Sequence, residues 1–339
     1  RSYHISALYS PVGMFDWVSF VRDWLEAWDT ENNRPRDLGL LQEFYNNNLG
    51  EPFELQGEKI KFTTVSQHRR GEYALGEVPN YFAENVGGGA IQLLTCVVDV
   101  HKDNLAVGII GWSPGARPWV IDYWRFEGNC EELDSEPWQR LRDLIETKEY
   151  IGDDGSRYRP AITLVDSSWS TDLVYRFCSA YESGVYPIKG RDTPPKSATI
   201  KEFSPFVTTL GTTAYTVTVD MYKDRLAMLL RRSWDGHNEQ PLGHFNAPSD
   251  LGDKAIKELT AETKRERVDK ATGRRMGVVW HRPSGAANEL WDLLVYASAA
   301  LDMCAYDICI NRFEMQTVNW EAFWLFTKQE DWYCTRVKN

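Results

Sequence analysis

The stretch Leu93-Leu94-Thr95-Cys96-Val97-Val98-Asp99-Val100 is an apolar run that carries a single carboxylate near its end. An uninterrupted apolar run of this length, with several β-branched residues, is typical of a strand buried on both faces. An ionised Asp99 within such a strand loses hydration that its apolar neighbours do not replace. Asp99 therefore needs a partner, and a cation is one partner that would serve.

Further elements follow Asp99 in a recognisable order. A polar turn, His101-Lys102-Asp103-Asn104, predicts a hairpin to the next strand. Patterning then predicts strands at 105–112 and 119–126, a helix at 135–148, a strand at 161–165 ending at Asp166, a helix at 171–183 stopped by Gly184, and a strand at 185–188.

Three hairpin-linked strands followed by helix, strand, helix and strand is the order of the ribonuclease H-like fold. In that fold the first and fourth strands are neighbours at the centre of the sheet. We therefore predict an α/β fold class, with a ribonuclease H-like mixed central sheet flanked by helices. Asp99 and Asp166 would lie side by side at the carboxyl ends of their strands, where open α/β sheets bind ligands.

The residues before this sheet differ in pattern. Apolar residues at 17, 20, 21, 24, 25 and 28 predict an amphipathic helix over 16–28, and a short helix is predicted at 38–45. Gly87-Gly88-Gly89 closes the region like a hinge. We predict a helical linker region at residues 1–90 and a ribonuclease H-like domain at residues 91–339.

The second half of the chain reads as an insertion followed by a strong helix. The insertion at 190–285 contains a basic hairpin predicted at 264–280, turning near Gly273. The helix at 288–301 places apolar residues on one face and carries Asp292. Other expected elements are a strand at 215–219, helices at 221–232 and 253–262, and a helical tail beyond Met303.

Composition excludes several classes of protein. A chain of 339 residues with 42% hydrophobic residues and 14 tryptophans can bury a large core. Its six cysteines form no CxxC pair, which favours a reduced, intracellular protein, and its six scattered histidines do not predict a zinc site. No apolar run approaches the ~18–20 residues of a membrane span. The chain opens with no signal peptide and no initiator methionine, so we expect a fragment of a longer protein.

The net charge of −11 argues against tight, sequence-independent DNA binding by the whole surface. A nucleic-acid substrate would have to meet a local basic patch or be delivered by another part of the protein. Candidate phosphate contacts are Lys189, Lys223, Arg274 and Arg275, although a solvated basic surface explains them equally well. The chain has no Walker A motif and so no phosphate loop of its own.

Asp99, Asp166 and Asp292 stand out among the 49 acidic residues because each lies within or at the end of an apolar segment. Convergent carboxylates raise one another's pKa unless a cation compensates. Oxygen ligands without Cys or His select Mg²⁺ or Mn²⁺. Two such ions ~4 Å apart can activate water and stabilise a departing 3′ oxygen in phosphodiester hydrolysis. Taken singly, capping explains Asp166 and an ion pair explains Asp292; His101 is either a helper at the site or a structural turn residue.

Several blocks of this chain resemble the large terminase subunit of lambda-type tailed bacteriophages, in its C-terminal endonuclease portion. The most specific block, Asn288-Glu289-Leu290-Trp291-Asp292-Leu293-Leu294-Val295-Tyr296-Ala297, is similar to the family pattern Asn-Glu-x-x-Asp-x-x-x-Tyr-Ala. Trp291 stands where the family often has a smaller residue. Further similar blocks are Val98-Asp99-Val100, Val165-Asp166-Ser167, Ile188-Lys189-Gly190, Gly243-His244-Phe245 and Glu258-Leu259-Thr260-Ala261-Glu262.

The resemblance implies a divalent-metal-dependent DNA endonuclease of a genome-packaging motor. Asp99 would bridge two Mg²⁺ or Mn²⁺ ions, and Asp166 and Asp292 would each complete one coordination sphere. The implied partners are concatemeric double-stranded viral DNA, the small terminase subunit and the portal protein, with no membrane. The implied location is the host cytoplasm, transiently at the procapsid portal. The missing Walker A motif would then belong to an absent N-terminal ATPase motor domain.

Three alternatives remain open at this point. Another ribonuclease H-like nuclease, such as a transposase or a resolvase, fits the same strand order and the same carboxylates. An actin-like ATPase shares the opening strands but would need glycines in the first hairpin, and residues 101–104 contain none. A non-catalytic DNA-binding or docking module of the packaging motor is the third alternative.

Overall fold

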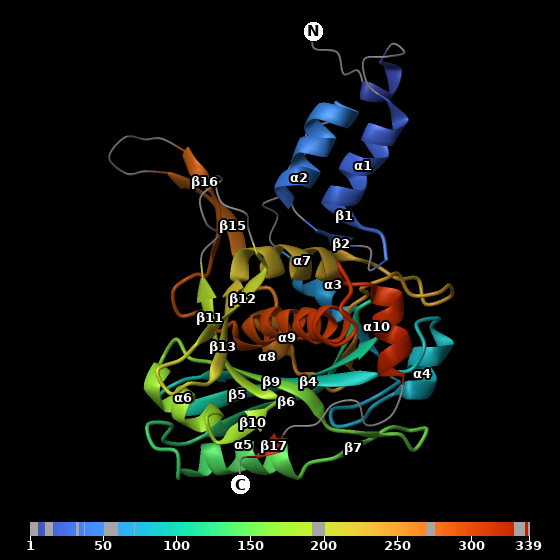
Figure 1. Cartoon of the computed structure of the whole chain (residues 1–339). Helices are drawn as coiled ribbons and strands as arrows, with labels where there is room; N and C mark the ends of the chain where they lie inside the picture. Colours follow the sequence, from blue (N-terminus) through green and yellow to red (C-terminus); the bar gives the residue numbers. More distant parts are fainter. Residues whose placement is uncertain are drawn as a thin grey trace.

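A mixed sheet of seven strands forms the centre of the protein (Figure 1). The computed structural model describes residues 6–10, 16–31, 34–36, 38–50, 60–70, 72–191, 201–268, 275–328 and 336–337. The strand order in the sheet is β12-β13-β11-β9-β4-β5-β6. Its strands are β4 (Leu93–Val100), β5 (Asn104–Ser113), β6 (Arg117–Glu127), β9 (Pro160–Asp166), β11 (Val185–Arg191), β12 (Phe203–Val207) and β13 (Thr213–Thr218).

The pairing within the sheet agrees with the predicted fold class. β4 runs antiparallel to β5 and parallel to β9, and β9 runs parallel to β11. The first and fourth strands of the predicted order, β4 and β9, are therefore neighbours at the centre of the sheet. The α/β fold with a mixed central sheet flanked by helices is confirmed, and its strand order is consistent with a ribonuclease H-like nuclease.

Helices cover both faces of the sheet, which is why β4 is apolar on both sides. Val97 belongs to the core under α9 (Glu289–Tyr306), α7 (Val219–Arg231), α8 (Asp253–Glu258) and α3 (Phe62–Ser66). Val98, the next residue, belongs to the opposite core, under α5 (Glu136–Glu146), α6 (Thr171–Cys178) and α4 (Asn80–Asn85). Figure 1 shows α9 lying across one face of the sheet with α7 stacked on it, and α5 and α6 on the other side.

The central helix has an unusual length and composition. Together with the π-helix η3 (Asp307–Arg312), α9 forms a segment long and apolar enough to cross a membrane. However, 83% of its most apolar window is buried inside the protein, which identifies a core helix. The prediction that no segment reaches that length was wrong, because acidic residues such as Asp302 interrupt the apolar run in the sequence while pairing inside the fold.

Two predicted helices end earlier than expected. The helix predicted at 171–183 stops at Cys178, and β10 (Tyr181–Ser183) follows. Tyr181 packs on Phe177 at 5.7 Å between ring centroids and donates a hydrogen bond to Glu146, so burial of its ring overrides helical continuation. The helix predicted at 253–262 stops at Glu258, and the turn after it carries Glu262 into the interior.

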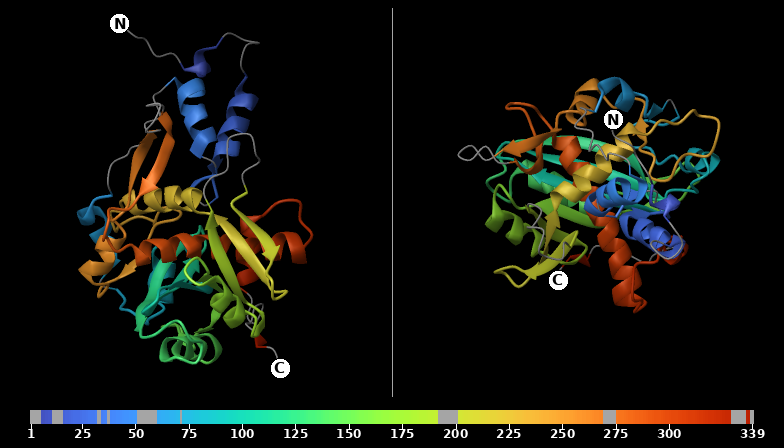
Figure 2. Two further views of the ribbon diagram at one scale, coloured as in Figure 1. Left: turned by 90° about the vertical axis from the view of Figure 1, so that its left-hand side faces the viewer. Right: turned by 90° about the horizontal axis from the view of Figure 1, so that it is seen from above.

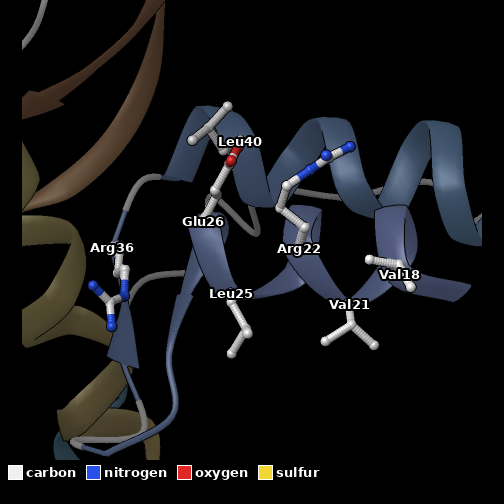
Figure 3. A pocket seen from close by; sticks show the side chains of 7 residues that line it. All are labelled: Val18, Val21, Arg22, Leu25, Glu26, Arg36 and Leu40. Atoms are coloured by element: carbon white, nitrogen blue, oxygen red, sulfur yellow. The ribbon is translucent and has the colours of Figure 1, made fainter.

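The N-terminal helices form an arm that projects away from the sheet (Figure 1 and the left view of Figure 2). α1 (Trp17–Ala27) begins at the N-cap Asp16, whose carboxylate accepts from the Ser19 amide at 2.6 Å. It packs on α2 (Leu38–Glu43) and η2 (Phe44–Leu49) through its aromatic face, including Phe20 and Phe44 at 4.9 Å between centroids. Its other face borders an open groove, shown in Figure 3, lined by Val18, Val21, Arg22, Leu25, Glu26, Arg36 and Leu40.

Residues 60–86 pack with the sheet. Val65 lies in the core under α9, and Tyr73 and Val78 lie in the opposite core. β3 (Arg69–Arg70) pairs with β14 (Ala247–Pro248). The domain division at residue 90 stays a prediction. The remaining elements are η1 (Ala7–Tyr9), β1 (Trp28–Asp29), β2 (Arg34–Pro35), β7 (Tyr150–Ile151), β8 (Arg157–Tyr158), β15 (Thr263–Val268), β16 (Arg275–His281), α10 (Trp320–Thr327) and β17 (Arg336–Val337).

Candidate active site

Asp99 and Asp166 occupy matching positions on neighbouring parallel strands. The last registered pair between β4 and β9 is Val98 with Val165, and each aspartate is the next residue of its strand. Side chains alternate along a strand, so Asp99 points to the same face as Val97. Asp166 likewise shares its face with Leu164, and both residues belong to the core under α9. The two carboxylates therefore open toward α9.

α9 brings two further polar side chains to this end of the sheet. Asp292 and Tyr296 are four residues apart, which places them on one side of the helix. The Tyr296 hydroxyl donates to Asp166 Oδ2 at 3.3 Å. A Cβ on Gly190 would lie 2.8 Å from Val219 and 3.4 Å from the Tyr296 hydroxyl, so glycine permits this close approach.

The pKa values of these groups report their mutual proximity. Burial raises the pKa of Asp166, the charge of Asp99 raises it further, and hydrogen bonds from Ser168 lower it. Burial also raises the pKa of Asp292, to about 7, with Lys223 lowering it and Glu262 and Asp99 raising it. The pKa of Tyr296 is raised well above its ordinary value by burial and by the charges of Asp166, Asp292 and Asp99. The charges of all three aspartates therefore act on the Tyr296 hydroxyl, which contacts Asp166 directly.

A buried network extends from Asp292. Lys223 donates to both carboxylate oxygens of Glu262, at 2.8 and 2.7 Å, and its ammonium lies 3.6 Å from Asp292 Oδ1. The Asn288 amide donates to Glu262 at 2.8 Å and to Asp292 at 2.7 Å. Arg282 donates to the Asn288 carbonyl oxygen at 2.5 Å, which orients that amide. Glu262 is thus a fourth carboxylate at this site.

A second cluster borders Asp99 on the other side. His101 Nε2 lies 3.2 Å from Asp99 Oδ2, and the Asp99 carboxylate raises the pKa of His101. Arg125 pairs with Glu289 at 2.7 Å and with Glu258 at 3.5 Å. Glu258 is held from two directions, because Tyr123 donates to it at 2.7 Å and the Leu290 amide at 3.1 Å. This cluster fixes the first turn of α9 against the sheet.

The predicted phosphate contacts lie in different surroundings. Lys189 is exposed and follows Ile188, the β11 residue that is in register with Asp166. Ile188 belongs to the core under α9. Because side chains alternate between the two faces of a strand, Lys189 points to the face of the sheet opposite α9. Lys223 is 13% exposed and paired with Glu262 inside the site. Arg275 begins β16, and Arg274 lies outside the described residues. Their contact with DNA stays a prediction.

Glu262 and Asn288 were not predicted as site residues. Glu262 belongs to a quoted sequence block but follows a helix in an irregular turn, where no periodic pattern marks a buried residue. The one sequence feature that could have indicated its burial is its position after Leu259-Thr260-Ala261, a short stretch with little polar character. Asn288 carries a clearer signal, since it stands four residues before Asp292 on the same helical side.

The donor set suits a hard divalent cation. Asp99, Asp166, Asp292 and Glu262 are carboxylates at the edge of an apolar core, and oxygen ligands of this kind select Mg²⁺ or Mn²⁺. A bound cation would relieve the repulsion among these carboxylates and the raised pKa values of Asp166 and Asp292. Among the described residues, no group of three or more His, Cys, Asp or Glu side chains already forms a metal-binding cluster. The carboxylates would have to turn to share an ion.

The class of protein follows from a match to known families. Residues 1–320 match the family "Terminase large subunit gpA, endonuclease domain". Because the match covers most of the 339 residues, the chain belongs to this family. The resemblance drawn from residues 288–297 and the other blocks is thereby confirmed.

Two curated relatives are similar along nearly the whole chain. The terminase large subunit of Escherichia phage lambda is 26% identical over 351 aligned residues, covering 99% of this chain and 48% of that protein. The terminase large subunit of Enterobacteria phage P21 is 26% identical over 319 residues, covering 88% of this chain and 43% of that protein. The chain therefore spans less than half the length of these relatives. No solved structure gives a significant match.

Proposed function

We propose that this chain is the DNA-cutting part of a viral genome-packaging terminase and hydrolyses phosphodiester bonds with divalent metal ions. The observation that carries the proposal is the register of Asp99 and Asp166 beneath Asp292 and Tyr296. Asp99, Asp166 and Asp292 would hold the ions. Two Mg²⁺ or Mn²⁺ ions, when bound, supply the Lewis acidity that activates a water and stabilises the departing 3′ oxygen.

The protein's own groups prepare this chemistry. Tyr296 and Ser168 both donate to Asp166, which orients its carboxylate and favours the ionised form that a cation needs. Asn288 does the same for Asp292. Because these orienting residues come from the turn after β9, from α9 and from the N-cap of α9, they are themselves placed by the rigid parts of the fold.

The test is nicking of supercoiled plasmid DNA in Mn²⁺. Asp99→Asn should abolish nicking while leaving the circular dichroism spectrum and the unfolding midpoint close to those of the wild type. Asp103→Asn is the matched control, since Asp103 is exposed in the turn that follows the same strand, and it should cut like the wild type. Wild-type nicking by Asp99→Asn would contradict the proposal.

The proposed substrate is concatemeric double-stranded viral DNA, and the proposed partners are the small terminase subunit and the portal protein. The support is the family membership and the similarity to two phage terminase large subunits. The proposed location is the host cytoplasm, transiently at the procapsid portal. A transposase would join strands and a resolvase would require branched DNA, so analysis of the products from linear duplexes separates these reactions.

A non-catalytic docking role makes a different prediction for metal binding. Calorimetric titration of the wild-type chain with Mn²⁺ should give saturable binding that Asp99→Asn weakens. Absence of saturable binding, together with absence of nicking, would support the docking role in place of the nuclease.

A further inference from the structure

Lys223 is the only lysine or arginine of the described residues whose charged group contacts both Glu262 and Asp292. Its side chain is 13% exposed and that of Glu262 is 3% exposed, so the pair is shielded from water. An ammonium that donates to both oxygens of a buried carboxylate is a strong, charge-assisted contact. Lys223 comes from α7, Glu262 from the turn after α8 and Asp292 from α9, so the ammonium joins three segments at the site.

We propose that Lys223 is a resident counter-ion that competes with the metal. In the metal-free protein its ammonium holds Glu262 and Asp292. When a divalent ion binds at these two carboxylates, the ammonium leaves both of them and becomes free to contact a DNA phosphate. This inference rests on the proposed metal-dependent function and names a positioning residue for it.

Asp99, Asp166, Glu262 and Asp292 place four carboxylates at one site, and Lys223 is the cation that pairs with two of them. A divalent ion and an ammonium carry charge of the same sign, so each disfavours the other when both approach Asp292. The ammonium has a flexible four-carbon stem and can move several ångströms, whereas the short side chains of Asp99, Asp166 and Asp292 can only turn on backbones fixed in β4, β9 and α9. The lysine therefore yields when the metal arrives.

The first experiment measures metal affinity. Lys223→Met keeps the stem and removes the charge; at a pH of about 8 it should bind Mn²⁺ about fivefold more tightly by calorimetry than the wild type. Lys264→Met is the matched control. Lys264 is 12% exposed and pairs with Asp224 at 2.5 Å, so its substitution removes a similar ion pair that involves none of the four site carboxylates and should leave the affinity unchanged. Unchanged or weaker binding by Lys223→Met would overturn the inference.

The second experiment needs no substitution at the site, so it holds even if Lys223→Met fails to fold. Acetylation by acetic anhydride, read by mass spectrometry, reports the accessibility of individual lysines. Addition of Mn²⁺ to the wild type should increase labelling of Lys223 at least about threefold while Lys264 stays protected, because only Lys223 leaves a carboxylate. Equal labelling of Lys223 with and without Mn²⁺ would contradict the displacement.

The two proposals fail in different ways. The wild type could bind Mn²⁺ and nick DNA although Lys223→Met leaves the Mn²⁺ affinity unchanged and Mn²⁺ leaves the labelling of Lys223 unchanged. In that case the counter-ion role is wrong and the nuclease proposal stands. If the wild type neither binds Mn²⁺ nor nicks DNA, both proposals are overturned.

Discussion

Asp292 lies among charges of both signs, and its protonation should therefore govern the site. The Lys223 ammonium and the Asn288 amide favour its ionised form, whereas burial and the charges of Glu262 and Asp99 oppose it. Burial dominates, because the pKa of Asp292 rises from 3.8 to about 7. A ligand carboxylate with this pKa binds a metal ion weakly at acidic pH, where it is protonated. It binds the ion strongly above about pH 7, where it is ionised.

This pKa leads to a stability prediction. The folded protein binds a proton at Asp292 between about pH 4 and pH 7, where the unfolded chain has already released it. The free energy of unfolding in EDTA should therefore fall as pH rises through that window. Asp292→Asn removes the titrating group and should flatten the fall, and Mg²⁺ should also reduce it by stabilising the ionised carboxylate.

Urea unfolding at about pH 5 and about pH 8 measures both effects. The raised pKa of Asp166 acts in the same direction, so some of the fall should remain in Asp292→Asn. The exposed Asp103→Asn variant should follow the wild-type pH dependence. Identical pH dependence in Asp292→Asn and the wild type would show that Asp292 does not titrate in this window.

Residue by residue, the sequence predicts the site only where chemistry coincides with a regular element. Asp99 and Asp166 end apolar strands and Asp292 interrupts an apolar helix, so each is visible as an exception to a pattern. Glu262 sits in an irregular turn, and its burial arises from packing against α7 and α9, which local sequence does not encode. The ion pair of Lys223 is likewise tertiary, which is why sequence alone leaves it as a surface cation.

At the scale of elements, α9 decides whether the site forms. It lies against β4, β5 and β9, and its Leu293 side chain packs over Gly108 of β5. A Cβ there would lie 3.4 Å from both Leu293 and Val97. Leu293 follows Asp292 directly in α9. The spacing between α9 and the sheet at Gly108 therefore also sets the distance from Asp292 to Asp99.

Substitutions at Gly108 test this spacing. Gly108→Ala adds a Cβ at ordinary contact distance and should change the free energy of unfolding by less than about 1 kcal/mol. Gly108→Val adds two methyl groups beyond that point and should destabilise the protein by about 1–3 kcal/mol while reducing nicking. Urea denaturation and plasmid nicking measure the two effects. Full activity in Gly108→Val would show that α9 can shift without disturbing the site.

In this chain, sequence periodicity is a good predictor of strands and long helices but a poor predictor of the residues at which helices end. β4 spans the quoted stretch, because its apolar run is bounded by polar residues on both sides. α6 ends five residues before its predicted stop, since the pattern at 171–183 continues past Cys178 although Tyr181 must reach the core. Helix ends depend on contacts with distant segments, whereas the apolar run that marks a strand such as β4 is local.

At the scale of the whole molecule, the charge distribution opposes tight DNA binding. The chain carries −11 overall, yet residues 264–275 contain six basic and two acidic residues. β15 and β16, which bound this segment, leave the body next to Glu262 and project on the same side as the α1–α2 arm (Figure 1, Figure 2). A local basic hairpin beside an acidic site can orient DNA, but it adds few phosphate contacts against a repulsive background.

The isolated chain should therefore bind duplex DNA weakly, with a Kd above about 1 μM at ~0.15 M salt, and its nicking should fall steeply as salt rises. Fluorescence anisotropy with a labelled duplex measures the binding. A Kd far below this value would contradict the charge argument.

A tethering experiment separates weak binding from weak chemistry. Fusing a sequence-independent DNA-binding domain to the chain through a flexible linker raises the local DNA concentration to the order of millimolar, with no change at the site. Nicking at ~0.15 M salt should rise at least about tenfold in the fusion. The same fusion carrying Asp99→Asn should stay inactive, because delivery does not replace the carboxylate. If the active fusion cuts no faster than the isolated chain, DNA binding is not the limiting step and the site itself sets the rate.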